Sequence, residues 1–152
     1  WTAEERIEFN FEQYRRYVRA VDALAELHGA KSAFFIQPCP AIGKSLTPEE
    51  RQKAGDLSYG AAYQRMADEL LELNDEGLPL YSLLDVFERT PETVYVDQIH
   101  CRLGRSTACG SGLRFKPSAG YKVISDAIAD RLAELWSFPA AEPQDDRKES
   151  AP

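Results

Sequence analysis

Apolar residues recur at spacings of three and four along the first part of the chain, a pattern that indicates an amphipathic helix. The inward stripe of this helix comprises Ile7, Phe11, Tyr14, Val18, Val21, Ala25 and His28. Thr2 and Glu5 have the spacing of a capping box, and Gly29 follows the last apolar position as a C-terminal stop. The pattern therefore predicts one long helix at the start of the chain.

Two short runs of consecutive apolar residues predict buried parallel strands. The first run covers Ser32 to Gln37 and the second covers Leu80 to Leu84. Between them, Thr47 and the three residues after it begin a helix, with threonine as the N-cap, proline at the first helical position and Glu50 closing the capping box. A second amphipathic helix follows, with an inward stripe of Tyr59, Tyr63, Met66, Leu70 and Leu73.

The last part of the chain predicts an extended segment over Thr93 to Val96, an irregular loop, and a helix from about Ser118 to Trp136. The alternation of helices and strands is typical of an α/β fold and resembles the C-terminal half of a doubly wound sheet. We expect one domain over residues 1–138 and a disordered polar tail over residues 139–152. A sheet with so few strands would expose an edge, so we also expect self-association.

Composition narrows the possible partners. The chain has 152 residues, 43% of them apolar, and a net charge of −7 with scattered basic residues, which argues against a nucleic-acid surface. No apolar stretch approaches the roughly 20 residues of a membrane span. The start at Trp1, without Met or an apolar leader, indicates a processed chain or an excised segment.

Three cysteines, Cys39, Cys101 and Cys109, lack the Cys-x-x-Cys spacing of a structural zinc site. We expect free thiols that are buried or partly buried, and the alternative is a disulfide between Cys101 and Cys109, which bracket a loop, in an oxidising compartment. The sequence leaves the compartment undetermined, with a periplasmic or secreted location favoured.

Asp97 and His100 follow the extended segment and are the principal candidate catalytic residues. A carboxylate that holds one nitrogen of a histidine leaves the other nitrogen free to act as a general base. Gln37, which ends the first strand, is a candidate substrate-binding residue because open α/β sheets bind ligands at the carboxyl ends of their strands. In the alternative interpretation Asp97 caps a turn and His100 lies on the surface. A metal site made of Asp97, Glu88 and His100 has little support without a helical His-x-x-x-His pattern.

The chain resembles the SGNH hydrolases, the GDSL esterase and lipase superfamily. The resemblance rests on Tyr95 to His100 followed by Gly120 to Ser125 and the terminal helix, and on Phe34 to Pro38, which looks like the family's fourth strand. It covers roughly residues 5 to 136. It implies a flavodoxin-like three-layer sandwich with a parallel sheet, of which this chain would be the incomplete C-terminal half. It also implies that Asp97 orients His100, that His100 activates a serine, that no cofactor is needed, and that the substrate is a small ester or an acylated carbohydrate.

The family's serine belongs to a Gly-Asp-Ser block near its N-terminus, and its oxyanion hole uses a further Gly and Asn. This chain contains no such block, and Gly55-Asp56-Leu57-Ser58 is similar but lies between the wrong elements. We therefore expect the C-terminal portion of a serine ester hydrolase, with little esterase activity by itself. The alternative is a non-catalytic SGNH-like domain that binds a carbohydrate or a protein partner. An unrelated flavodoxin-like module would need a phosphate-binding loop after a first strand, and the sequence offers none.

Overall fold

The computed structural model describes residues 1–102, 105–109, 112–116 and 118–137. The expected polar tail over 139–152 lies outside the described residues. In chain order, the elements are α1 (Ala3–Leu27), β1 (Phe34–Ile36), α2 (Pro48–Ala54), α3 (Gly60–Leu71), the 3₁₀ helix η1 (Glu72–Glu76), β2 (Leu80–Ser82), β3 (Arg105–Cys109), β4 (Gly112–Lys116) and α4 (Ala119–Trp136). The fold is mixed α/β, as the alternation of patterns predicts.

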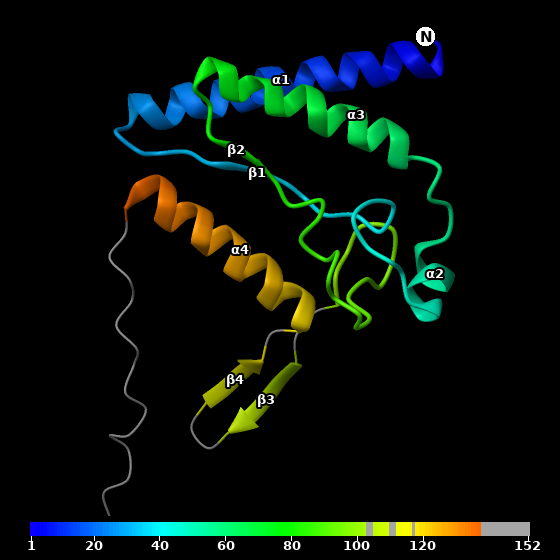
Figure 1. The fold of residues 1–152 in the computed structure, drawn as a ribbon. Coiled ribbons are helices and arrows are strands. Elements are labelled where there is room, and N and C mark those ends of the chain that lie inside the picture. Colours follow the sequence, from blue (N-terminus) through cyan, green and yellow to red (C-terminus); the bar gives the residue numbers. More distant parts are fainter. Residues whose placement is uncertain (103–104, 110–111, 117, 138–152) are drawn as a thin grey trace, which may run out of the picture.

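The two predicted strands form a parallel pair, with Phe34 opposite Leu80 and Ile36 opposite Ser82. In Figure 1, α1 and α3 lie on one side of this pair and α4 lies on the other. Within the described residues the parallel sheet has two strands. The segment after Cys101, expected to be an irregular loop, instead contains the antiparallel hairpin β3–β4. That expectation was wrong because Arg105–Cys109 and Gly112–Lys116 pair with each other in register and so satisfy their backbone groups.

The core consists of two clusters. The first lies between α3 and the parallel pair and comprises Ile36, Ala67, Leu70, Leu73, Leu78, Leu80 and Leu84. The second lies further along the chain and comprises Phe87, Val94, Tyr95 and Cys101. The rings of Phe87 and Tyr95 meet edge to face with centroids 5.5 Å apart. This second cluster directly supports the segment that carries the candidate site.

Both predicted capping boxes are present. At α1, Thr2 and Glu5 exchange backbone-to-side-chain hydrogen bonds of 2.6 and 3.1 Å. At α2, Thr47 and Glu50 do the same at 2.8 and 3.2 Å. Gly29 has a φ of +66°, as expected for the residue that ends α1. These features are local in sequence, which is why sequence patterns predict them well.

The stripe predicted for α1 is only partly buried. Phe11 is buried, whereas Tyr14 and Val21 are 53% and 51% exposed. A helix of 25 residues is roughly 37 Å long, whereas a strand of three residues spans roughly 10 Å. The strand pair and α3 are therefore too small to cover the whole apolar side of α1. Among the residues the structure describes, no helix is both long and apolar enough to cross a membrane.

Candidate functional site

A short, closed loop carries both candidate catalytic residues. Tyr95 and Cys101 form an antiparallel bridge. The backbone nitrogen of Val96 donates to the carbonyl oxygen of His100 at 2.9 Å, and that of Arg102 donates to the carbonyl oxygen of Val94 at 2.7 Å. These bonds close residues 96–100 into a loop, referred to below as the dyad loop, whose two ends are fixed on the second core cluster.

Asp97 and His100 are in direct contact within the dyad loop. Oδ2 of Asp97 lies 2.8 Å from Nδ1 of His100. Oδ1 of Asp97 accepts backbone N–H bonds from Ile99 at 2.8 Å and from His100 at 2.7 Å. This arrangement is an Asx turn, in which a carboxylate organises the backbone two and three residues ahead of it. The two residues are in the contact that their spacing predicts, and the turn capped by Asp97 also fits the alternative interpretation, so the catalytic role of the pair stays a prediction.

The electrostatics of the pair favour a charged carboxylate and an oriented imidazole. The pKa of Asp97 is lowered to about 2, chiefly by the backbone N–H of His100, then by that of Ile99 and by the imidazole itself. An ionised Asp97 can only accept at Oδ2, so a neutral His100 must carry its proton on Nδ1. The other ring nitrogen, Nε2, then has a free lone pair. The imidazole is 69% exposed, so a reacting group could reach it from solvent.

Gln37 binds the dyad loop. Its side-chain Nε2 donates to the carbonyl oxygen of Ile99 at 3.0 Å, while its own backbone carbonyl oxygen accepts a hydrogen bond from Tyr63 at 3.0 Å. Tyr59 donates from its hydroxyl to the carbonyl oxygen of Gln98 at 2.8 Å. The end of β1 and the start of α3 thus hold the tip of the loop. A contact between Gln37 and substrate remains a prediction.

The Gly55 to Ser58 segment lies beside the dyad loop. Its position in the sequence, between two predicted helices, did not indicate that it would lie there. Nε2 of Gln98 donates to the carbonyl oxygen of Asp56 at 3.1 Å. The hydroxyl of Ser58, however, donates to Oδ2 of Asp56 at 2.8 Å. Within the described part of the chain, no serine hydroxyl is hydrogen-bonded to His100.

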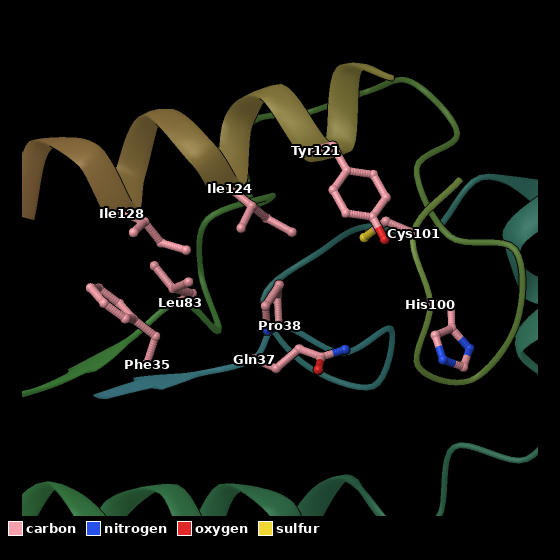
Figure 2. A pocket seen from close by; sticks show the side chains of 9 residues that line it. All are labelled: Phe35, Gln37, Pro38, Leu83, His100, Cys101, Tyr121, Ile124 and Ile128. Atoms are coloured by element: carbon pink, nitrogen blue, oxygen red, sulfur yellow. The ribbon is translucent and has the colours of Figure 1, made fainter. Parts of the chain in front are cut away.

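Two pockets flank Gln37. The first, of about 320 Å³, lies between the parallel strands and α4 (Figure 2). It is lined by Phe35, Gln37, Pro38, Leu83, His100, Cys101, Tyr121, Ile124 and Ile128. The second, of about 340 Å³, is lined by Gln37, Pro38, Cys39, Tyr59, Tyr63, Gln98 and Ile99. The dyad loop therefore borders a largely apolar hollow on each side of Gln37.

The cysteines near the site are poor nucleophiles. Cys39 and Cys101 are buried free thiols, so the alternative of a disulfide at Cys101 is wrong. Burial raises the pKa of both thiols, that of Cys101 to about 11. Each thiol is thus protonated at neutral pH, and the thiolate is the reactive form. The side chain of Cys109 lies outside the described residues.

A buried ion pair adjoins the residues that precede the dyad loop, and the sequence patterns did not predict it. Nζ of Lys44 lies 3.2 Å from Oε2 of Glu50, and both side chains are 0% exposed. Oε1 of Glu50 accepts backbone N–H bonds from Val94 and Tyr95, immediately before the dyad loop. The capping box identified Glu50 as a helix-start residue, but no local signal indicated these partners 44 and 45 residues away.

Over the described ranges, no three His, Cys, Asp or Glu side chains are grouped as ligands for a metal ion. Comparison of the chain with models of protein families, with curated proteins and with solved structures finds no match.

Proposed function

We propose that this chain supplies the acid–base half of a serine ester hydrolase of the SGNH type. In this proposal Asp97 orients the imidazole and His100 is the general base. The observation that carries it is the 2.8 Å contact between Asp97 Oδ2 and His100 Nδ1 on an imidazole that is otherwise open to solvent. The serine and the donors of the oxyanion hole would lie outside residues 1–152.

The chemistry follows from the two nitrogens of His100. Nε2 would take the proton of the serine hydroxyl as its oxygen attacks the ester carbonyl, and would then give that proton to the departing alkoxide. A water molecule, deprotonated in the same way, would release the acid and regenerate the serine. Asp97 would keep the imidazole in its reactive tautomer and stabilise the imidazolium that forms transiently.

The fold part of the proposal is a flavodoxin-like three-layer sandwich of which the described elements form a portion. Helices on both sides of the parallel pair support it (Figure 1). The position of Gln37 also supports it, because this residue directly follows β1 and contacts the dyad loop. The dyad is thus next to the carboxyl end of a parallel strand, where open α/β sheets bind their ligands.

The proposed substrate is a small ester, such as the acyl ester of a carbohydrate. The pocket that includes His100 is walled mainly by apolar side chains, among them Phe35, Ile124 and Ile128. At roughly 30 Å³ for a group the size of a water molecule, its volume of about 320 Å³ would hold roughly ten heavy atoms. That is enough space for a short acyl group.

The test is covalent labelling of the complete gene product with a fluorophosphonate, which reacts with activated serines, followed by mass spectrometry. We expect one labelled serine, no labelling in His100→Gln, and normal labelling in His28→Gln. His28 is the only other histidine of the chain and lies at the end of α1, so it is a matched control. Absence of labelling in the unaltered protein, or equal labelling in His100→Gln, contradicts the proposal.

The second candidate is a non-catalytic domain that binds a carbohydrate or a protein partner. The observation that favours it is that, in the described residues, Ser58 is bonded to Asp56 and no serine hydroxyl reaches His100. The same labelling separates the two candidates, because a binding domain has no activated serine to modify.

A further inference from the structure

We propose that Glu50 is a positioning residue for the Asp97–His100 pair, and that Lys44 is the counter-ion that allows it to act as a buried anion. This role of Glu50 rests on the proposed function, because Glu50 positions a catalytic pair only if Asp97 and His100 are catalytic. Independently of that function, Glu50 holds the backbone from which the dyad loop starts.

Both carboxylate oxygens of Glu50 have two partners each. Oε1 accepts the backbone N–H groups of Val94 at 2.8 Å and of Tyr95 at 3.1 Å. Oε2 accepts the backbone N–H of Thr47 at 2.8 Å and lies 3.2 Å from Nζ of Lys44. The start of α2 and the start of the dyad loop are thus joined through one carboxylate.

The ammonium group of Lys44 is also held by more than one partner. Besides its contact with Glu50, Nζ donates to the carbonyl oxygen of Thr90 at 2.8 Å. An uncompensated charge inside a protein is strongly unfavourable, so the pair is stable only because each charge has several fixed partners. Burial alone would raise the pKa of Glu50, but its hydrogen bonds from Thr47, Val94, Tyr95 and Lys44 outweigh burial and lower it.

The path from Glu50 to the dyad is short. Val94 accepts from Arg102 through its carbonyl, and Tyr95 bridges Cys101, so the residues that Glu50 binds are themselves paired with the far end of the loop. One residue, Val96, separates Tyr95 from Asp97. Both ends of the dyad loop therefore depend on the backbone that Glu50 holds.

A helix cap alone would not need this arrangement. Glu5 forms the same kind of capping box with Thr2 at the start of α1, but on the surface and with bonds only to its own helix start. Glu50 adds two bonds to a segment more than forty residues away, and its carboxylate is buried from water. Glu5 is therefore a matched control for the capping function.

The experiment is nitrogen-15 NMR of the imidazole rings in the 152-residue chain, which has only two histidines. In the unaltered protein, neutral His100 should be mainly the Nδ1–H tautomer, because ionised Asp97 accepts at that nitrogen. Glu50→Leu, which removes both acceptor oxygens, should abolish this preference while the signals of His28 stay in place. Glu5→Leu, which removes only a cap, should leave both histidines unchanged.

Glu50→Leu leaves Lys44 as an unpaired buried cation, which can itself prevent folding. The double variant Lys44→Met with Glu50→Leu removes both charges and both acceptor oxygens, and it should lose the His100 tautomer preference in the same way. A folded Glu50 variant in which the His100 signals are unchanged, even at a lower melting temperature, makes Glu50 a helix cap only and overturns the inference. The NMR measurement needs no serine or ester. It therefore tests the role of Glu50 separately from the fluorophosphonate labelling, which tests the proposed function.

Discussion

Asp97 holds His100 at two points: Oδ1 accepts its backbone N–H at 2.7 Å and Oδ2 contacts its Nδ1 at 2.8 Å. One carboxylate therefore contacts both the backbone and the ring of His100. The loop that carries these contacts is held at its start by Glu50 and at its tip by Gln37 and Tyr59.

Acid should weaken the folded state through Asp97. The pKa of this group is about 2 in the folded protein, below the value of about 3.9 for an unfolded aspartate. The stabilisation that ionised Asp97 gives the folded state is thus fully present above about pH 4 and is lost as the pH falls toward 2. The melting-temperature difference between the unaltered protein and Asp97→Asn should shrink over this range. If carbon-13 NMR gives a titration midpoint near 4 for the Asp97 carboxyl group, the hydrogen bonds from Ile99 and His100 to that group are absent in solution.

Tyr95→Phe should not destabilise the protein. The ring is fully buried against Phe87, and within the described residues its hydroxyl has no hydrogen-bond partner. Removing a buried, unpaired hydroxyl should leave stability unchanged or raise it by about 1 kcal/mol. Urea unfolding measures this. A loss of more than about 1 kcal/mol would mean that the hydroxyl has a partner, since typical hydrogen bonds contribute that much.

Gly43→Ala should be strongly destabilising. Gly43 has a φ of +71°, and an added Cβ would overlap the carbonyl group of Leu84. Backbone strain and steric overlap together should cost at least about 3 kcal/mol. Gly29→Ala is the control, because Gly29 has a φ of +66° with open space around it, so strain alone should cost about 1 to 2 kcal/mol. Equal unfolding free energies for the two variants would contradict the packing described here.

The parts of the fold that the sequence predicts well depend on neighbouring residues. The Thr2–Glu5 and Thr47–Glu50 boxes and the Asp97–His100 contact all join residues three apart, so the local spacing of the residue types indicates each pairing. The strand pair was also predicted, because a short run of consecutive apolar residues such as Phe34 to Ile36 is typical of a buried parallel strand.

The parts that were missed depend on distant segments. Lys44 and Glu50 are charged residues that sequence rules place on the surface, and only the arrival of Val94 and Tyr95 makes their burial favourable. Likewise, whether Val21 is buried depends on how much sheet lies under α1 and not on the periodicity of α1.

The exposed apolar side of α1 should govern association of the chain in solution. Val21 and Leu24 are 51% and 56% exposed, and Tyr14 and Tyr17 precede them on the same side of the helix. The double variant Val21→Glu with Leu24→Glu should therefore lower the average mass in sedimentation experiments and leave the melting temperature nearly unchanged. An unchanged mass distribution would place the associating surface elsewhere, with the sheet edge the next to test.

In the proposed function, His100, held by Asp97, is the general base for a serine. The most direct measurement is the rate of acyl-enzyme formation by the complete gene product, followed as the burst of p-nitrophenolate from p-nitrophenyl acetate. We predict that Asp97→Asn slows the burst by roughly 10⁴-fold and His100→Gln by at least about as much, as for the corresponding changes in serine proteases, while His28→Gln leaves it unchanged. A burst rate in His100→Gln within about tenfold of the unaltered protein would contradict this claim, since general-base catalysis contributes at least about 10²-fold.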